Sequence, residues 1–420
     1  MSQAANPEPA PSKAQVRLRI IGLSVLSFFL MGSYSLARST SESLFIEAHT
    51  SKGLPLVWVL VSLGMLASVL VYTHFVPRFE LMNLFGVVTF ISTGLMVALM
   101  LGRQAELPGM HHMLYVWKDT YMVVLVEIFY SFANSAFTIQ AARWVYGLFG
   151  ILGGVGAIVG NLAVRQLAPQ IGTANTLWLV APMLVGIALG AMALGRAAGV
   201  ENPLRGAERP PGISDAIRVA RRSSYLLLVL LLIALTQCVI TLIDFSFNEI
   251  VEAIYPETDA RTALVSTVYA AISTGMLLLH GSTGPLLRLA GVPLVLLSIP
   301  LIMGGGVTVF TVAPALATVL VIKVGSKCFD YTLFRNAKEI LYIPLSYQER
   351  TQGKSLVDML TYRVAKGIAS AMLAAALATG LPNIVNLLTL ALIGGWFLVT
   401  LVVTRRFRQK VSREEEINGK

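Results

Sequence analysis

Residues 225–248 read YLLLVLLLIALTQCVITLIDFSFN, an apolar run that is long enough to cross a membrane as one helix. About twenty apolar residues in a helix span the roughly 30 Å of hydrocarbon in a bilayer. The polar residues of the run follow one another at steps of four, three and four: Gln237, Thr241, Asp244 and Asn248. These steps place them on one helix face, so the run predicts a membrane span with a polar stripe.

Apolar runs of this kind recur along the whole chain. Only 13% of the residues are charged and 55% are hydrophobic, whereas a soluble protein carries about a quarter charged residues. The twelve runs predict an all-α polytopic membrane protein with about 12 transmembrane helices. The expected spans are Ile20–Phe45, Leu54–Val76, Leu81–Leu101, Tyr121–Ala141, Trp144–Leu167, Thr176–Leu194, Tyr225–Asn248, Ala263–His280, Pro293–Val312, Leu316–Phe334, Tyr362–Gly380 and Ile384–Thr404.

Lysine and arginine are unevenly distributed over the loops between these spans. With the N-terminus inside, the inner loops and tails hold 22 of them and the outer loops hold five: Lys52, Arg103, Lys118, Arg165 and Arg261. Cytoplasmic loops of membrane proteins carry the excess of positive charge. We therefore expect a multi-pass protein of the cell (inner) membrane with both termini in the cytoplasm.

The longest basic loop divides the spans six and six. Two six-helix halves with both termini on one side are typical of parallel repeats, and the major facilitator architecture fits this pattern best. The expected domains are a disordered tail (1–15), an N-terminal half (16–194), a basic cytoplasmic linker (195–224), a C-terminal half (225–404) and a second cytoplasmic tail (405–420).

Several classes of function lack their sequence signals. The net charge of +10 follows the membrane topology, so no nucleic-acid partner is expected. No cofactor is expected, and no metal site either, because His111 and His112 lack partners at ligand spacing. No ATP-motor motif or catalytic constellation is visible. A solute transporter is therefore the leading interpretation, acting as a monomer in the bilayer on a small anionic substrate; a membrane-embedded enzyme and a non-transporting receptor or scaffold remain as alternatives.

Ionisable and polar groups within the spans are the candidate substrate site, because such groups are costly in hydrocarbon and normally face a water-filled cavity or a partner. Arg38 and Glu42 are four residues apart and can pair on one helix face. An alternative is that these charges only bridge helices, for example Lys327 with Asp330. The candidate substrate-binding residues are Arg38, Glu42, Glu127, Asn134, Arg143, Asp244, Asn248, Lys327, Lys338 and Arg363.

One block of sequence resembles a known family. Residues 334–366 read FRNAKEILYIPLSYQERTQGKSLVDMLTYRVAK. This is similar to the ATP/ADP translocases of plastids and obligate intracellular bacteria, where K-E-M-A-Y-I-P-L is followed by K-G-K-A-x-x-D and R-x-x-K. Lys338, Glu339, Gly353, Lys354, Asp358, Arg363 and Lys366 stand at matching positions. The resemblance implies a transporter that exchanges nucleotides by alternating access.

The chain departs from this family at two cationic positions. The family has R-x-T-K-D in the first span, where this chain has Ser41 in place of the lysine. It has L-V-E-V-T-W-K in the seventh span, where the acid stays as Asp244 but the lysine becomes Asn248. Because a triphosphate needs dense positive charge, we expect a cargo with less negative charge than ATP. A carboxylate metabolite or a metal chelator is the alternative to a nucleotide.

Overall fold

The computed structural model describes residues 12–198, 200, 213–346, 349–350, 361–381 and 383–418. Every regular element in these ranges is a helix, as the apolar runs predict. The first group comprises α1 (Lys13–His49), α2 (Leu54–Phe75), α3 (Leu81–Gln104), α4 (Met110–Ala136), α5 (Ile139–Ile171), α6 (Thr173–Trp178) and α7 (Val180–Ala198). After the short α8 (Ile213–Arg222) come α9 (Ser224–Ile254), α10 (Thr258–Val312), α11 (Leu316–Phe329), the π-helical turn η3 (Asp330–Phe334), α12 (Arg335–Leu341), α14 (Tyr362–Ala378) and α15 (Ile384–Asn418).

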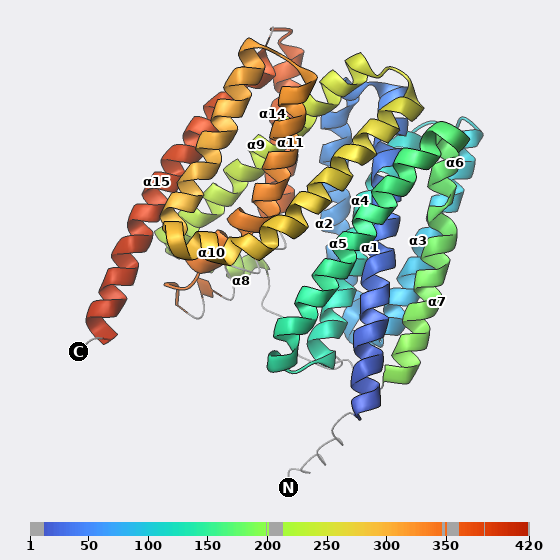
Figure 1. The fold of residues 1–420 in the computed structure, drawn as a ribbon, viewed down its shortest axis with the longest axis horizontal. Helices are drawn as coiled ribbons and strands as arrows, with labels where there is room; N and C mark the ends of the chain where they lie inside the picture. Colours follow the sequence, from blue (N-terminus) through green and yellow to red (C-terminus); the bar gives the residue numbers. More distant parts are fainter. Residues whose placement is uncertain are drawn as a thin grey trace.

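Two groups of helices lie side by side in Figure 1, one blue to green and the other yellow to red. Each has its own apolar core: one core is built from α1–α7 and the other from α8–α15. A third apolar cluster joins the groups, with Phe45, Trp58 and Tyr115 on one side and Phe245 and Leu373 on the other. The two groups therefore pack as separate bundles that share one seam.

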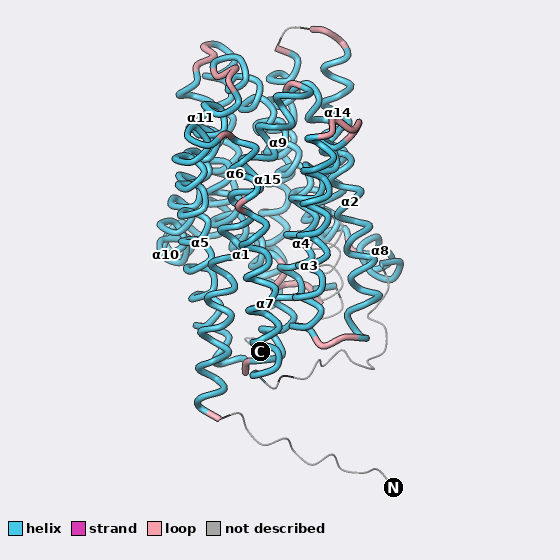
Figure 2. The backbone as a smooth tube through the Cα atoms, turned by 90° about the vertical axis from the view of Figure 1, so that its right-hand side faces the viewer, coloured by secondary structure: helices cyan, strands magenta, loops and turns pink. Residues whose placement is uncertain are grey.

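The helices run back and forth between two ends of the molecule. The end where α1 begins and α15 finishes, at the bottom of Figure 1 and Figure 2, is called the terminal end here, and the other is called the opposite end. Hydrogen bonds between the bundles in the described part gather toward the opposite end. There Ser51 N donates to Glu252 Oε2 at 2.7 Å, and Thr173 N donates to Asp259 Oδ1 at 2.7 Å.

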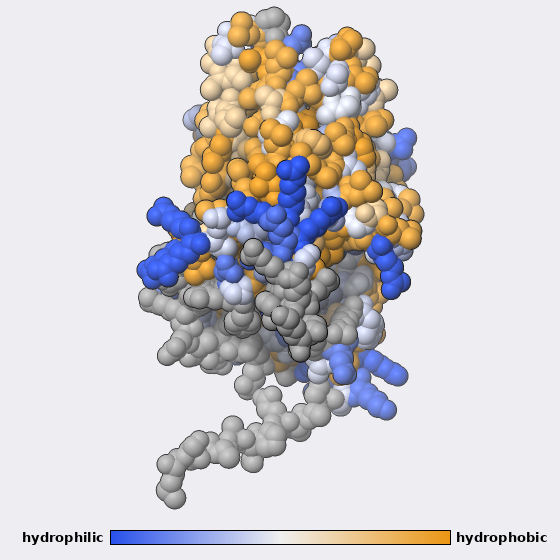
Figure 3. All heavy atoms as spheres, turned by 90° about the vertical axis from the view of Figure 1, so that its left-hand side faces the viewer, coloured by the Kyte–Doolittle hydropathy of each residue, from blue (hydrophilic) through white to orange (hydrophobic). Residues whose placement is uncertain are grey.

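Eight of the described helices are long and apolar enough to cross a membrane. Three predicted spans are missing from this set for physical reasons: α4 carries several charged residues, α11 has 14 residues before η3 interrupts it, and α14 has 17 residues. The fourth difference from the twelve predicted spans arises because α10, which is counted as one helix, contains two of them. Figure 3 shows the resulting surface, with an orange apolar zone above hydrophilic side chains that gather toward the terminal end.

The long helix α10 is two arms joined at Gly291. This glycine has φ 76° and ψ 154°, a conformation that a residue with a side chain rarely adopts. Pro293 follows, and its fixed φ and missing N–H favour a break at this point. The arms correspond to the predicted spans Ala263–His280 and Pro293–Val312.

The fourth span is shifted from its predicted position. It was expected at Tyr121–Ala141, but α4 covers Met110–Ala136. Phe137 is extended, and the Thr138 hydroxyl accepts from Ala141 N at 3.4 Å to cap α5. Thr138 therefore lies outside the fourth span and caps the start of α5. Lys118, which was assigned to an outer loop, lies buried inside the helix.

Helix α1 starts earlier than expected and ties the terminal end together. Ser12 and Gln15 form a reciprocal capping box, so the helix begins at Lys13 inside the segment predicted as a tail. Further along α1, the buried guanidinium of Arg19 donates to Ala198 O at 2.7 and 3.0 Å and to Ala136 O at 3.1 Å. It thereby satisfies carbonyls at the ends of α7 and α4 that no helical N–H can reach.

Candidate functional site

Ionisable side chains converge where the two bundles meet. We call this set the central charge cluster; its members are Arg38, Glu42, Lys118, Asp119, Asp244, Lys323, Lys327 and Lys366, from α1, α4, α9, α11 and α14. Four of the eight, Arg38, Glu42, Asp244 and Lys327, are among the candidates that the sequence predicts. Arg38 and Glu42 of α1 share one helix face because they are four residues apart, and so do Lys323 and Lys327 of α11.

Glu42 is held by the other bundle. Its carboxylate is 4% exposed, Oε1 accepts from Asn248 Nδ2 at 2.8 Å, and Oε2 accepts from the Tyr269 hydroxyl at 2.9 Å. No ion pair within 4.0 Å joins Arg38 and Glu42, both of which lie in the described part. The expected pairing of these two residues is therefore wrong, because the partner bundle supplies better-placed donors.

Arg38 is stacked instead of paired. Its guanidinium carbon lies 3.8 Å from the centre of the Tyr269 ring and 5.9 Å from that of Tyr34. Guanidinium groups are attracted to aromatic faces in this way. The guanidinium donates no hydrogen bond to any side chain or carbonyl within the described residues, so its planar set of N–H groups is available for an anion.

Asp244 binds two lysines of α11. Its Oδ1 lies 2.8 Å from Lys323 Nζ and its Oδ2 lies 2.7 Å from Lys327 Nζ. Both lysine side chains are nearly inaccessible, at 1% and 8% exposure, and Asp244 itself is 18% exposed. The alternative pairing of Lys327 with Asp330 is not found, since Lys327 is engaged by Asp244. One carboxylate thus neutralises part of the charge of two cations.

Asp119 was missed in the sequence. It is 6% exposed, it lies 3.0 Å from the Nζ of its neighbour Lys118, and its Oδ1 accepts from the Tyr34 hydroxyl at 3.0 Å. The signal was the adjacent pair Lys118 and Asp119, which the shifted boundary of the fourth span had placed in a loop. Tyr269 was missed as well, because a tyrosine in an apolar run carries no charge signal.

Lys366 completes the cluster from α14. It interacts electrostatically with Asp119, Lys118, Lys327 and Asp244, and its Nζ lies 5.9 Å from the centre of the Trp58 ring. Like Arg38, it donates no hydrogen bond to a residue of the described part. These two cations are therefore the ones in the cluster whose donors the protein itself leaves unused.

The remaining candidates lie elsewhere. Lys338 is buried in α12 and donates to the Tyr362 hydroxyl at 3.2 Å, and Arg363 is buried in the first turn of α14. Glu127 is exposed, and Asn134 accepts from the Tyr146 hydroxyl. The Arg143 side chain lies outside the described part of the structure. The structure thus brings together Arg38, Glu42, Asp244, Asn248 and Lys327, and it places Glu127, Asn134, Lys338 and Arg363 elsewhere.

The histidines contact one another more than their spacing predicts. The His49 ring lies 4.4 Å from that of His112 and 5.8 Å from that of His111, measured between ring centres. These ring contacts, which the spacing of His111 and His112 does not predict, form because the end of α1 meets the start of α4. Among the described residues, no group of three metal-ligating side chains could hold a metal ion.

The chain is similar in sequence to known ADP,ATP carrier proteins. A family model described as "TLC ATP/ADP transporter" matches residues 301–407. The chain is 22% identical to the chloroplastic ADP,ATP carrier protein 1 of Arabidopsis thaliana over 94% of this chain and 75% of that protein. It is 24% identical to ADP,ATP carrier protein 1 of Chlamydia pneumoniae over 58% of this chain and 56% of that protein.

Solved structures share the fold. The nucleoside transporter NupG superposes with a TM-score of 0.69 at 11% identity, covering 93% of this chain and 99% of that one. The POT family transporter PepTSo superposes with a TM-score of 0.69 at 12% identity, covering 96% and 99%. At such low identity these matches speak for the fold alone. The sequence matches confirm the resemblance seen in residues 334–366: residues 301–407 match the model of the ATP/ADP transporter family, and the chain is similar in sequence to ADP,ATP carrier proteins.

Proposed function

We propose that the protein is a secondary transporter that moves organic anions across the cell membrane by alternating access, with nucleotide exchange as its leading activity. The observation that carries this proposal is a pair of half-buried cations, Arg38 and Lys366, which lie where the two bundles meet and donate no hydrogen bond to a described residue. A carboxylate or phosphate group can accept two parallel hydrogen bonds from one guanidinium. The relatives named ADP,ATP carriers make a nucleotide the first candidate.

The proposal includes a twelve-span topology. The spans are α1 to α5, α6 with α7, α9, the two arms of α10, α11 with η3 and α12, α14, and α15, arranged in halves 16–194 and 225–404 with the linker 195–224 between them. The terminal end is cytoplasmic, because the excess of Lys and Arg gathers there even after Lys118 and Lys338 are moved from the loops into helices. Reporter fusions after Arg222 and at the C-terminus should be active only as cytoplasmic fusions; a periplasmic result at either site would exclude this topology.

Uptake by intact bacteria tests the transport activity. Cells that express the chain should take up labelled ATP or ADP in a saturable manner, and external unlabelled nucleotide should chase the label out by exchange. Cells carrying Arg38→Ala should take up much less, because the proposed anion site loses its guanidinium. Cells that express Arg17→Ala, a change at an arginine of the same helix outside the central charge cluster, provide the matched control. Equal uptake with Arg38→Ala and with the unmodified chain would contradict the assignment of the site.

A less charged organic anion is the second candidate substrate. The central charge cluster holds five cations, Arg38, Lys118, Lys323, Lys327 and Lys366, against three carboxylates, Glu42, Asp119 and Asp244, which leaves a surplus of two positive charges. A single phosphate ester carries roughly −1.5 to −2 charge at pH 7, which matches this surplus better than a triphosphate does. A nucleoside monophosphate or a dicarboxylate would therefore be balanced without further cations.

Competition in proteoliposomes separates the two candidates. If the charge surplus selects the cargo, AMP or a dicarboxylate should compete with the labelled substrate at lower concentration than ATP. The double change Ser41→Lys with Asn248→Lys should move the preference back toward ATP. Ser41 and Asn248 are 1% and 0% exposed, and each has a buried oxygen, Oγ and Oδ1, without a hydrogen-bond partner. Tighter binding of ATP than of AMP by the unmodified protein would exclude the less charged substrate.

A further inference from the structure

A buried carboxyl group lies outside the central charge cluster, on the π-helical turn of the tenth span. Asp330 is 9% exposed and opens η3, the turn that joins α11 to α12. Its two carboxylate oxygens accept hydrogen bonds from one amide, Gln237 Nε2, at 3.2 and 3.3 Å. Turns of this type are rare and are frequent at functional sites. The carboxyl group therefore has one neutral partner from the facing helix α9.

No cation of the described part lies within ion-pair distance of Asp330. The charged groups in its surroundings are on its own segment: Lys327, which is engaged by Asp244, and Arg335 and Lys338. The elements packed against it contribute Gln237 from α9, Ile299 and Met303 from α10 and Trp396 from α15, none of which titrates in the physiological range. A buried carboxylate without a paired cation is costly, and uptake of a proton removes the charge.

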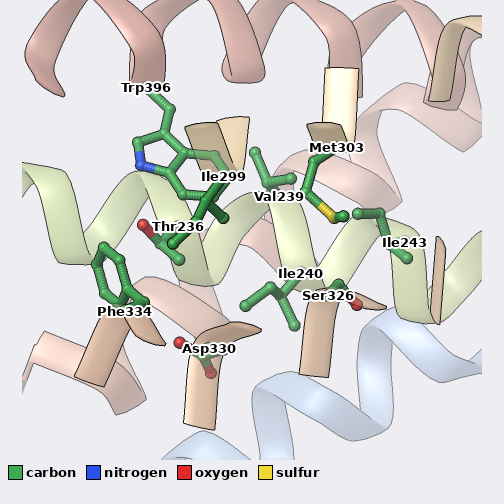
Figure 4. A pocket seen from close by; sticks show the side chains of 10 residues that line it. All are labelled: Thr236, Val239, Ile240, Ile243, Ile299, Met303, Ser326, Asp330, Phe334 and Trp396. Carbon is green, nitrogen blue, oxygen red and sulfur yellow. The ribbon is translucent and has the colours of Figure 1, made fainter. Parts of the chain in front are cut away.

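A small cavity lies against this carboxyl group. Figure 4 shows it between α9, α10, α15 and η3, with Asp330, Thr236 and Trp396 among the side chains around it. Its empty volume is about 240 Å³, and the space open to a water molecule holds about one water. The Trp396 indole N–H is buried and has no hydrogen-bond partner. The cavity is thus lined by polar groups of three elements: the Trp396 indole, the Thr236 hydroxyl and the Asp330 carboxyl group.

We propose that Asp330 binds and releases the proton that couples anion transport to the proton gradient. The reaction is the addition of one proton to the carboxylate to give the neutral acid, and its loss to water at the other side; no other bond changes. In the charged form Asp330 holds the Gln237 amide, and Gln237 stands on the same polar stripe as Asp244. Protonation of Asp330 weakens the hydrogen bond from Gln237 to its carboxyl group. Because Gln237 and Asp244 belong to the same helix α9, this change affects the position of Asp244 in the central charge cluster. This inference rests on the proposed transport function.

The experiment uses purified full-length protein in two arms. Infrared difference spectra between mildly acidic and mildly alkaline buffer should show the C=O stretch of a protonated carboxyl group, and Asp330→Asn should lack it. In proteoliposomes, an imposed acid gradient should drive accumulation of labelled ADP or AMP by the unmodified protein. Asp330→Asn should keep gradient-independent exchange but lose accumulation above equilibrium at least ten-fold. Asp330→Glu, which keeps a titratable carboxyl group, should restore part of the accumulation.

The two arms separate the failure of this inference from that of the transport function. Glu106→Gln, at an exposed loop residue, is the matched control and should behave as the unmodified protein. Gradient-driven accumulation by Asp330→Asn at the unmodified rate would overturn the proposal, as would an unchanged carboxyl band in its spectrum. If no nucleotide moves at all, the transport function fails, while the infrared arm still decides whether Asp330 takes up a proton.

Discussion

In the transport function that we propose, Arg38 is the residue of the central charge cluster on which substrate recognition depends most. Lys323 and Lys327 pair with Asp244, and Lys118 pairs with Asp119. The guanidinium of Arg38 is oriented by its stack on Tyr269 and keeps its donors for a ligand. Planarity matters here, because the stack and a two-point hydrogen bond use the same flat group. The charge alone would not give this geometry.

Arg38→Lys should therefore weaken anion binding although the charge is kept. The substituted side chain loses the stack on Tyr269 and one of two parallel hydrogen bonds, each worth on the order of 1–3 kcal/mol in a partly buried site. The half-saturating concentration for exchange should rise about ten-fold or more, with the amount of protein in the membrane unchanged. Transport kinetics in proteoliposomes measure this. An unchanged half-saturating concentration in Arg38→Lys would show that Arg38 acts by charge only.

Only part of the central charge cluster could be predicted from the pattern of residues in the sequence. Arg38, Glu42, Asp244, Asn248 and Lys327 were predictable because charged and polar side chains inside an apolar helix at steps of three or four residues share a face. Their partners were not predictable in this way, since Asn248 and Glu42 are 206 residues apart in the chain. Tyr269 is neutral, so nothing in its own sequence surroundings marks it as the ring that holds both Glu42 and Arg38.

At the scale of elements, the π-helical turn η3 rotates the second part of the tenth span. Lys327 and Lys338 are eleven residues apart, which in an unbroken α-helix is close to three full turns and would place them on one face. The extra residue accommodated in η3 breaks this register. Lys327 accordingly contacts Asp244, while Lys338 contacts Tyr362 of α14. Sequence spacing cannot reveal such a turn, because its residues carry no signal that distinguishes them from those of an ordinary helix.

Glycines set the distance between α1 and α5. A Cβ at Gly156 would lie 2.1 Å from Phe28 O, and one at Gly160 would lie 2.6 Å from Gly32 O, so neither position has room for a methyl group beside the backbone of α1. The small-xxx-small pattern of the fifth span predicts this close packing. Gly150 belongs to the same pattern in sequence, but nothing lies within 4 Å of its Cβ position.

Gly156→Ala should destabilise the protein and Gly150→Ala should not. The first change forces the backbones of α1 and α5 apart, a form of overpacking that costs about 1–3 kcal/mol. The second meets open space and replaces a poor helix former by a good one. Thermal unfolding in detergent should show a lower midpoint for Gly156→Ala and an unchanged or higher one for Gly150→Ala. Equal midpoints would mean that the α1–α5 contact adjusts freely.

At the scale of the whole molecule, the seam between the bundles is closed at the opposite end. The apolar cluster around Phe45, Trp58 and Phe245 lies on this seam, and three polar contacts reinforce it: Ser51 with Glu252, Thr173 with Asp259, and Arg261 with Ser43 O at 3.0 Å. In a transporter that works by alternating access, these contacts must break in each cycle.

A disulfide across this seam should therefore stop transport. The hydroxyls of Thr173 in α6 and Thr262 in α10 lie 2.9 Å apart, which suits a Cys pair at these positions. With Thr173→Cys and Thr262→Cys together, oxidation should abolish exchange and a reductant should restore it. Each single cysteine variant serves as the control and should be insensitive to the oxidant. Full exchange by the cross-linked protein would show that this end does not open during transport.

The global organisation was largely readable from the sequence because the bilayer restricts the choices. Backbone groups in hydrocarbon must be paired within a helix, so apolar runs such as 225–248 could be little else. The predicted helix boundaries were wrong where charged residues interrupt an apolar run, as at Lys118 and Asp119. A hydrophobicity criterion excludes such residues from the span, although they belong to the central charge cluster. The number of spans and the membership of the two halves remain predictions, since eight described helices meet the criterion for a span.

The contacts of Arg19 also constrain the order of events during biosynthesis. This arginine belongs to α1, which leaves the ribosome before the helices that it binds, and its acceptors are the carbonyls of Ala136 and Ala198, 117 and 179 residues later in the chain. The hydrogen bonds to Ala198 can form only after α7 has been synthesised. Until then the Arg19 guanidinium lacks its acceptor on α7. The packing of the N-terminal bundle is therefore complete only when its last helix, α7, has been added.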